Sequence, residues 1–465
     1  MREEPIEPAE WGEPSEPFEP ARPSRVRAVV AIVVAVAVTV AFLAGAIGAL
    51  LRGGGPDPTP PPQPGLLAVV SEGGLSTIDS LGGSRVAFGA DGGEVQFPAW
   101  SPDGTRIAAT RSLDGGGSVH VFEAGTPDVV TEIYTSTVRP PFYLSWSPDG
   151  AHVTFLTTEP DGIALRVAPA DGSADATLIQ LGAPSYWDWV DPARLMVHIG
   201  GTGAGSFVGD VDLGGKRLGD VEGAPGLFRA PAATSDGRLR AYVAAEADGS
   251  ESIVVAAPDG SKRVDVPVTG SVAFGFDPAG TTLAYIAPDG TAEPTVLPIG
   301  PLRIVDTTSG AARTALDGPV VAFFWSPDGR TIAALQLVPT GQPGVEEARA
   351  RVASTGSGRV TAAPPAGINA HLVFVDVAAG AGAGASADPA IRSERDVRLG
   401  DVFAFQLIPY FDQYAVSHRV WSPDSRSIVL PIAEGGAEPA RIVAFPADGS
   451  APTSITDGVA AFWRP

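Results

Sequence analysis

The chain has 465 residues, no cysteine and a formal net charge of −22, with 57 glycines and 45 prolines. The lack of cysteine excludes disulfides, thiolate metal sites and a lipid-modified N-terminal cysteine. The acidic balance argues against a nucleic-acid partner, because phosphate binding requires a basic surface. The glycines stand at repeated positions, so they indicate regular turns rather than one low-complexity tract.

Residues 1–27 form an acidic tail in which glutamate recurs at every third position from Glu4 to Glu19, mostly followed by proline. Polyproline II has three residues per turn, so this period would align the carboxylates along one face. The tail has too few apolar residues to build a core, and we expect it to be disordered. It serves as a solvated spacer, or Trp11 and Phe18 anchor a partner.

Residues 28–51 contain no charged side chain. At about 1.5 Å per residue, this stretch spans roughly 36 Å as a helix, enough to cross a membrane. Arg22, Arg25 and Arg27 precede it and Arg52 follows it. Because the more basic flank stays in the cytoplasm, we expect a signal-anchor with the N-terminus inside. The alternative is a cleaved signal peptide, but the apolar stretch is long for one.

Residues 52–65 are rich in glycine and proline and predict a semi-rigid linker of about 3 Å per residue. Such a linker would hold the following domain up to roughly 40 Å from the membrane surface. The predicted localisation is therefore the cell membrane, with a single span and with residues 66–465 on the extracytoplasmic side.

Residues 66–465 repeat one pattern about every 45 residues. Its centre is Trp-Ser-Pro-Asp-Gly, at Trp100–Gly104, Trp146–Gly150 and Trp325–Gly329, with a near copy at Trp421–Ser425. An apolar run leads into the Trp, a tight turn follows, and further short apolar runs complete the unit. Four short strands in a unit of this length predict a blade of a β-propeller.

Eight first strands are predicted, ending at Trp100, Trp146, Trp189, Thr234, Phe276, Trp325, Trp421 and Trp463. We therefore predict an all-β, eight-bladed propeller, with seven blades as the alternative. One step of about 96 residues is attributed to an insertion at Pro339–Ala370. The first unit lacks a first strand and Val459–Trp463 supplies one, so the C-terminal strand is expected to pair with the N-terminal blade and close the ring.

The motif is followed by Thr-Arg-Ile-Ala-Ala at 105–109 and by Arg-Thr-Ile-Ala-Ala at 330–334. With these residues it resembles the WD40-like repeats of the TolB-type propellers, over most of 66–465. The resemblance implies an extracytoplasmic, non-catalytic protein-binding domain. Similar blades also precede the hydrolase domain of prolyl oligopeptidases and dipeptidyl peptidases. A role in a Tol-type system is not carried over, because TolB is soluble, has fewer blades and has a second α/β domain.

The repeated Trp and Asp are expected to serve the blade, the Trp by filling space between sheets and the Asp by satisfying the turn. A calcium site would need several converging oxygens, whereas each repeated Asp stands alone in the sequence. No serine-hydrolase elbow, zinc-protease motif or phosphate-binding loop is present, and the five histidines lack metal-ligand spacing. The sequence therefore predicts no catalytic residue, no metal site and no cofactor.

The segment Phe403–His418 does not fit the repeat, because it is too long and too aromatic for a plain connection between blades. Its aromatic residues fill a gap beside the insertion, or they form a recognition surface. Connections between blades lie on the face opposite the Ser-Pro-Asp-Gly turns, and we predict that this face binds the partner. The candidate residues are Tyr410, Phe411, Asp412, Tyr414, His418 and Arg419.

The leading hypothesis is a membrane-anchored extracytoplasmic propeller that binds an envelope or secreted protein, a peptide or a glycan, or acts as a scaffold. The first alternative is a glycosidase-like or lyase-like enzyme with its site in the channel mouth, or a subunit of a peptidase complex. An enzyme of this kind would be indicated by paired carboxylates on the first strands. Those strands instead carry Gln96, Ser145, Asp188, Arg229 and Ser271. The second alternative is a transmembrane sensor that signals to the acidic tail.

Overall fold

The chain divides into two compact units, Met1–Gln63 and Pro64–Pro465, and the residues described by the computed structural model all lie in the second. They are 65–89, 94–113, 116–160, 162–183, 185–200, 205–221, 224–226, 229–245, 248–261, 264–289, 297–338, 368–377, 389–433 and 440–465. The predicted tail, the predicted membrane span, nearly all of the predicted linker and most of the predicted insertion lie outside these ranges. Within the ranges, no helix is long and apolar enough to cross a membrane.

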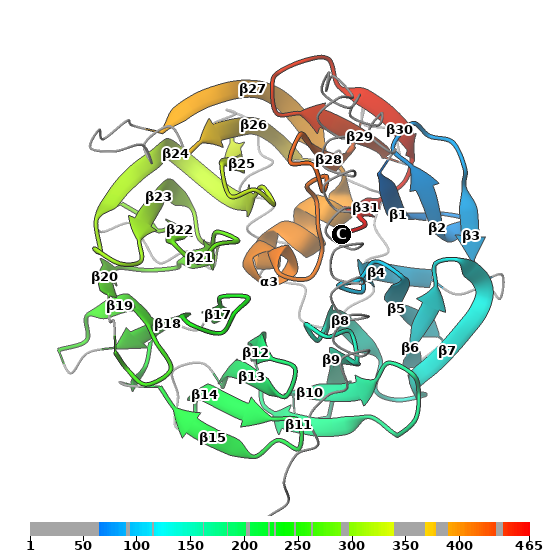
Figure 1. Cartoon of the computed structure of the whole chain (residues 1–465), viewed down its shortest axis with the longest axis horizontal. Helices are drawn as coiled ribbons and strands as arrows, with labels where there is room; N and C mark the ends of the chain where they lie inside the picture. The colour runs from blue at the N-terminus through cyan, green and yellow to red at the C-terminus, as the bar shows by residue number, and fades with distance from the viewer. Residues whose placement is uncertain are drawn as a thin grey trace, which may run out of the picture. The chain divides into compact units, whose positions relative to one another are not determined.

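The second unit is a ring of short antiparallel sheets, as in a β-propeller (Figure 1). One sheet contains β4 (Glu94–Trp100), β5 (Arg106–Leu113), β6 (Gly116–Glu123) and β7 (Thr126–Ser136). The next contains β8 (Pro141–Trp146), β9 (His152–Glu159), β10 (Gly162–Pro169) and β11 (Thr177–Leu181). A third contains β12 (Ser185–Asp191), β13 (Arg194–Ile199), β14 (Phe207–Asp212) and β15 (Arg217–Asp220).

A five-stranded sheet follows, with two very short strands at its inner edge. It contains β16 (Ala224–Pro225), β17 (Ala232–Ala233), β18 (Arg240–Ala245), β19 (Glu251–Ala256) and β20 (Val264–Val268). Strand β17 and strand β16 both pair with β18, so two short segments take the place of one longer inner strand.

The remaining strands of the second half form one continuous ten-stranded path. Its first half contains β21 (Ala273–Phe276), β22 (Thr282–Ile286), β23 (Gly300–Asp306), β24 (Ala312–Trp325) and β25 (Thr331–Leu337). Its second half contains β26 (Ile368–Asp376), β27 (Ala390–Leu399), β28 (Ser427–Ile432), β29 (Arg441–Pro446) and β30 (Thr453–Asp457). The strand predicted to end at Trp421 is absent, since Trp421 makes only an isolated bridge to Ile428.

The two ends of the described chain share one sheet, which confirms the predicted closure. This sheet contains β31 (Ala460–Trp463), β1 (Leu66–Ser71), β2 (Gly74–Asp79) and β3 (Val86–Phe88). Strand β31 pairs antiparallel with β1 from Leu67–Trp463 to Val70–Ala460. The pairing covers the inner edge of the N-terminal sheet, which would otherwise expose unpaired backbone groups.

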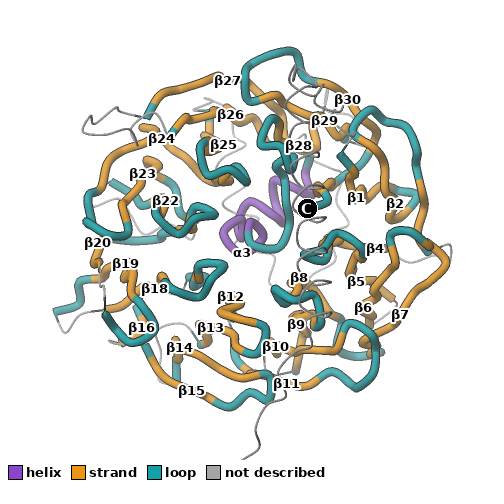
Figure 2. Tube along the Cα trace, in the orientation of Figure 1, coloured by secondary structure: helices purple, strands orange, loops and turns teal. Residues whose placement is uncertain are grey.

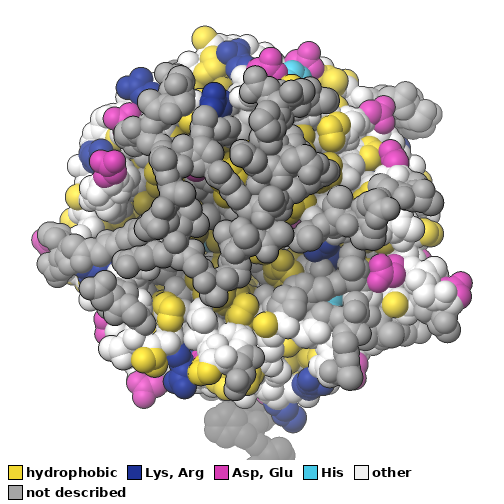
Figure 3. Space-filling view, turned by 180° about the vertical axis from the view of Figure 1, so that it is seen from behind, with side chains coloured by type: hydrophobic (Ala, Val, Ile, Leu, Met, Phe, Trp, Pro, Cys, Tyr) yellow, Lys and Arg dark blue, Asp and Glu magenta, His cyan; other side chains and the backbone are white. Residues whose placement is uncertain are grey.

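Burial falls from the inner strands to the outer strands. The four central residues of β1 are all buried, and so are five of the six residues of β13. Both faces of these strands are covered because neighbouring sheets pack face to face, so their sequences are continuously apolar. All four residues of the outer strand β15 are exposed, and most of those in β7 are not buried. On the face seen in Figure 3, acidic and basic side chains are interspersed around the rim.

The Ser-Pro-Asp-Gly motif forms a closed turn, as predicted. In the first copy, the Ser101 hydroxyl donates to Asp103 Oδ1 at 2.6 Å, and the same oxygen accepts the N–H of Thr105 at 3.0 Å. Gly104 has a φ of 66°, which an L side chain adopts with strain. The same Ser–Asp bond is present at Ser147, Ser326 and Ser422, each at 2.6 Å. The carboxylate is therefore used within its own turn.

Four of the repeated tryptophans join neighbouring sheets. In these four the indole Nε1 donates to the carbonyl oxygen just before the corresponding aromatic residue of the preceding repeat. These bonds are Trp100 to Phe462 (3.1 Å), Trp146 to Ala99 (2.9 Å), Trp325 to Gly275 (3.1 Å) and Trp421 to Phe324 (2.9 Å). The predicted structural role of the Trp and Asp repeats is thus borne out by their contacts.

Candidate functional site

The centre of the ring holds a helical segment formed by residues 401–419, which we call the central segment (Figures 1 and 2). It contains a π-helical turn η2 (Phe403–Leu407), a 3-10 turn η3 (Ile408–Tyr410) and an α-helical turn α3 (Phe411–Ala415). Its sequence was expected to form a long connection between blades, and it does run from β27 to Trp421. What the sequence did not indicate is that this connection is helical and packs inside the ring.

Tyr414 of the central segment lies in a cage of aromatic rings. Its ring centroid is 4.9 Å from that of Tyr143, 5.2 Å from that of Phe97 and 5.1 Å from that of His418. Phe97 and Tyr143 occupy equivalent places, three residues before the repeated Trp of β4 and β8. The contacts with Tyr143 and His418 are edge-to-face, and aromatic pairs of that geometry contribute about 0.5–1.5 kcal/mol each beyond area burial.

The two strand residues of this cage have unusual backbone geometry. Phe97 and Tyr143 have φ angles of 43° and 44°, and the strand pairing shifts register at both places. A left-handed conformation at a bulky residue costs on the order of 1–3 kcal/mol. The bulges turn both rings toward Tyr414, so packing on the central segment offsets this strain.

Gln413 anchors the central segment to β12. Its side-chain Nε2 donates to the carbonyl of Trp187 at 2.7 Å, and its Oε1 accepts the N–H of Trp187 at 3.2 Å. The hydroxyl of Tyr143 donates to the Gln413 carbonyl at 2.7 Å. The Gln413 side chain thereby bonds to the backbone of Trp187 as a residue of a neighbouring strand would. Gln413 is only 3% exposed.

His418 closes the segment against β4 and β31. Its Nε2 lies 3.0 Å from the carbonyl oxygen of Phe97, which can only accept, so Nε2 carries the proton. Its Nδ1 lies 2.6 Å from the Ser417 hydroxyl and accepts from it. Burial lowers the pKa of His418 to about 4, so the ring is neutral at physiological pH. The ring also packs on Phe462 at 4.7 Å.

The six residues predicted to form a binding face divide into two groups. Phe411, Tyr414 and His418 are 1%, 6% and 2% exposed, so they belong to the interior rather than to an exposed rim. Phe411 packs on Phe323 of β24 at 5.2 Å. Tyr410 is 47% exposed, Arg419 is exposed and Asp412 is partly buried. The predicted binding face remains a prediction, carried by these last three residues.

Two partly buried carboxyl groups lie on the inner strand β12 and on the central segment. Asp188 of β12 accepts the N–H groups of Ala233 and Trp189, each at 2.8 Å, and burial raises its pKa to about 7. Burial likewise raises the pKa of Asp412 to about 6, although the Arg229 guanidinium opposes this shift. Arg229 itself donates to the hydroxyl of Ser271. Sequence reasoning placed Asp188 on a first strand and named Asp412 as a binding-face residue, but it did not indicate that burial raises the pKa of both.

These carboxyl groups do not form a metal centre with other ligands. Among the described residues, no three His, Cys, Asp or Glu side chains cluster closely enough to hold a metal ion. His198, the histidine nearest in the chain to Asp188, is held by the backbone of Arg229, with Nδ1 3.1 Å from its carbonyl oxygen.

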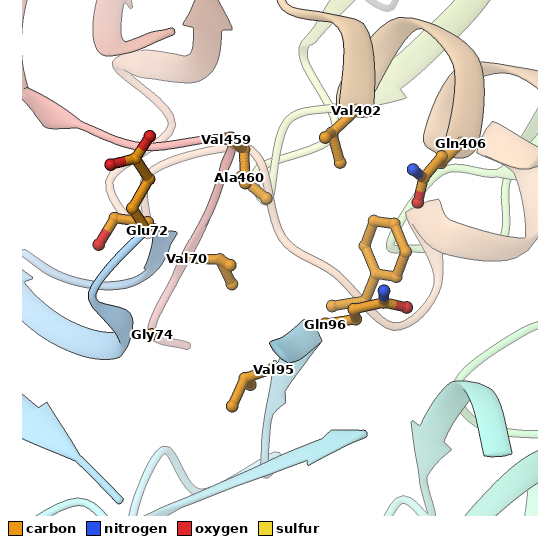
Figure 4. Close-up of a pocket in the computed structure, with 11 residues that line it drawn as sticks. Val70, Glu72, Gly74, Val95, Gln96, Val402, Gln406, Val459 and Ala460 are labelled. Atoms are coloured by element: carbon orange, nitrogen blue, oxygen red, sulfur yellow. The ribbon is translucent and has the colours of Figure 1, made fainter. Parts of the chain in front are cut away.

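A pocket of about 470 Å³ lies against the beginning of the central segment (Figure 4). It is enclosed by the β1–β2 hairpin, the start of β4, the start of β31 and the helical turn η2. No motif pointed to it, because the four elements that line it are far apart in the sequence. Its volume falls within the range of about 300–1,000 Å³ that is typical of ligand pockets.

The pocket opens on the face that the sequence analysis selected. The β1–β2 hairpin joins the second and third strands of its sheet, and η2 belongs to a connection between sheets. Both kinds of connection lie opposite the Ser-Pro-Asp-Gly turns, which join first and second strands.

No family model and no curated protein matches this sequence. Among solved structures, the chain is similar to one described as a eukaryotic initiation factor, with a TM-score of 0.51, 12% identity, and 87% of this chain and 99% of the other covered. It is also similar to the dihydro-heme d1 dehydrogenase NirN in complex with DHE, with a TM-score of 0.50, 14% identity, and 87% and 77% covered.

A TolB from Acinetobacter baumannii also matches, with a TM-score of 0.36, 13% identity, and 87% of this chain and 80% of the other covered. A likeness this distant carries no argument about family, so the resemblance of the repeats to TolB-type propellers remains a sequence observation. The two stronger matches have different activities and share under 15% identity with this chain. What the comparisons establish is the fold alone: a ring of antiparallel sheets of the β-propeller type.

Proposed function

We propose that this protein is a membrane-anchored extracytoplasmic β-propeller that binds a protein, peptide or glycan of the cell envelope. The binding surface is the face of the ring that carries the central segment. The observation that supports this is the division within that segment. Its buried side chains are used in packing, while Tyr410, Asp412 and Arg419 remain at least partly accessible.

The proposal includes eight blades. The ten-stranded path divides naturally at β24, whose first part pairs with β23 and whose last six residues pair with β25. It divides again between β27 and β28, which share the single pair Leu399–Ile432. Three blades along this path, with the five other sheets, make eight.

The membrane orientation rests on the arginines that flank residues 28–51. Protease added to intact cells is expected to degrade the propeller and to spare the glutamate-rich tail. Protection of the propeller would overturn both the orientation and the extracytoplasmic location.

The binding proposal is tested with the full-length chain, cross-linked in intact cells and then purified. An envelope component captured by the wild type should be lost or strongly reduced with Tyr410→Ala. Leu81→Ala is the matched control, because Leu81 is 81% exposed on the β2–β3 turn, which lies on the opposite face. Equal capture by both variants and the wild type would contradict the proposed surface.

The carboxyl groups of Asp188 and Asp412 favour one second candidate, an enzyme acting at the centre of the ring. Asp188 and Asp412 have raised pKa values of about 7 and 6, which suit general acid or base catalysis near neutral pH. Purified protein would then release reducing ends from envelope polysaccharide, and Asp188→Asn would abolish the release. No release by the wild type would remove this candidate.

A further inference from the structure

The pocket beside the central segment combines aliphatic side chains with a few polar ones. Its aliphatic side chains come from four separate elements and are Val70, Val95, Val402, Val459 and Ala460. Figure 4 shows them around a common space. An aliphatic lining in contact with solvent favours the burial of an aliphatic group from a ligand.

Two amide side chains stand at one side of this space. Gln96 of β4 and Gln406 of η2 both line the pocket, and Figure 4 shows them opposite Glu72. Within the described part of the chain, neither glutamine side chain makes a hydrogen bond. Gln406 is exposed, so its presence there is not required by the packing of the central segment. Each primary amide can donate and accept, which matches the alternating donors and acceptors of a peptide backbone.

The strand bulge at β4 explains why Gln96 is available. Strand β4 pairs regularly with β5 up to Gln96, and pairing resumes only at Ala99. Phe97, with its positive φ, turns toward Tyr414. Gln96 is therefore the last regularly paired residue at the edge of the pocket, and the next residue, Phe97, packs against the central segment.

We propose that this pocket binds an extended polypeptide segment of a partner, with an aliphatic side chain between the valines and its backbone amides on Gln96 and Gln406. The inference rests on the proposed function and names the ligand class for it. A saccharide is disfavoured because sugar rings stack on exposed aromatic faces, whereas Phe97, the aromatic residue of the lining, is only 8% exposed. Glu72 lies on the β1–β2 hairpin and Arg85 lies beside it, so the pocket has one nearby charge of each sign. We therefore expect the partner segment to be selected by its shape and hydrogen bonding rather than by its charge.

The test measures fluorescence anisotropy with the full-length chain in lipid nanodiscs and two labelled heptapeptides. One probe is Gly-Ser-Ala-Leu-Ala-Ser-Gly, and the other has Ser in place of its Leu. The wild type should bind the Leu peptide about tenfold more tightly. Val402→Phe fills the pocket and should abolish this preference. Gln406→Ala should weaken the binding of both peptides about fivefold, with an unchanged melting temperature. Leu81→Ala should bind as the wild type does.

Equal affinity for the two peptides, or full affinity in Val402→Phe, would overturn the inference. Displacement of the Leu peptide by cellopentaose would overturn it in favour of a saccharide site. These outcomes differ from a failure of the proposed function. If the cellular partner is still captured by the wild type and lost with Tyr410→Ala, the proposed binding surface is supported. Only the assignment of the pocket as a peptide site is then wrong.

Discussion

The Ser-Pro-Asp-Gly turns and the central segment use aromatic residues in opposite ways. At the turns, one contact recurs, with the indole of one repeat donating to the backbone of the repeat before it, as in Trp146 to Ala99. The central segment itself occurs once in the chain, and its contacts, such as the Tyr414 cage and the Gln413 anchor, differ from the contact at the turns. Residues that recur in every repeat stabilise the scaffold. A segment that departs from the repeat, such as the central segment, is where we expect a specific function.

The largest effect should come from breaking the ring on which both regions depend. Removal of Val459–Pro465 deletes β31 and leaves the backbone of β1 unpaired along one edge. We expect a loss of several kcal/mol, comparable with the whole net stability of a domain. Urea unfolding measures it, and removal of Pro465 alone, which leaves the Arg464 N–H bonded to the Leu66 carbonyl, is the control. A truncated chain as stable as the wild type would mean that the end-to-end pairing is not formed.

Alanine substitutions at Tyr414 and Tyr410 should distinguish the buried part of the central segment from its exposed part by their effects on stability. Tyr414→Ala leaves a cavity among Phe97, Tyr143 and His418 and should lower the free energy of unfolding by about 3–5 kcal/mol. Tyr410→Ala, at a side chain 47% exposed, should change it by less than about 0.5 kcal/mol. Similar values for the two variants would erase the distinction between buried and exposed aromatic residues on which the proposed surface depends.

Gln413 and Gln406 offer the same comparison with one residue type. Gln413→Ala leaves the N–H and carbonyl of Trp187 without partners in a buried place, which should cost about 2–3 kcal/mol. Gln406→Ala, at an exposed position, should be close to neutral. Chemical denaturation of both variants provides the measurement, and a neutral Gln413→Ala would show that the anchor is not formed.

Asp188 should make the free energy of unfolding depend on pH. Its pKa is about 7 in the folded chain, against about 3.9 when unfolded, so the folded state retains a proton that the unfolded state releases. Its contribution is therefore most favourable below about pH 4 and is lost as the pH rises toward 7. Between pH 5 and pH 8, Asp188→Asn should gain on the order of 2 kcal/mol relative to the wild type. A pH-independent difference would contradict the raised pKa.

The smallest effect tests a single repeat contact. Trp146→Phe keeps the aromatic packing but leaves the Ala99 carbonyl without its indole partner, at a cost of about 1–2 kcal/mol. Trp189→Phe is the matched control, because the buried Nε1 of Trp189 has no acceptor within the described chain. Thermal unfolding that ranks the two variants equally would mean that the repeated bond adds nothing to packing.

Local patterns were sufficient to predict the scaffold from sequence. The motif places Pro, Asp and Gly where a tight turn needs them, and apolar runs on both sides provide the strands. The unmatched strands at Leu66–Val70 and Val459–Trp463 also predicted the closure that β1 and β31 form. These features depend on residues close in sequence, or on a simple count of strands, so they are visible without the tertiary structure.

The contents of the ring's centre were decided by the tertiary structure. The segment 401–419 is marked in the sequence only as an exception to the repeat, with no periodicity that separates a surface loop from a buried helix. The burial of Tyr414 and His418 and the pocket between β1 and η2 both arise from groups more than two hundred residues apart. The sequence alone therefore determined that a ring would form, and long-range packing determined which side chains inside it remain free to bind.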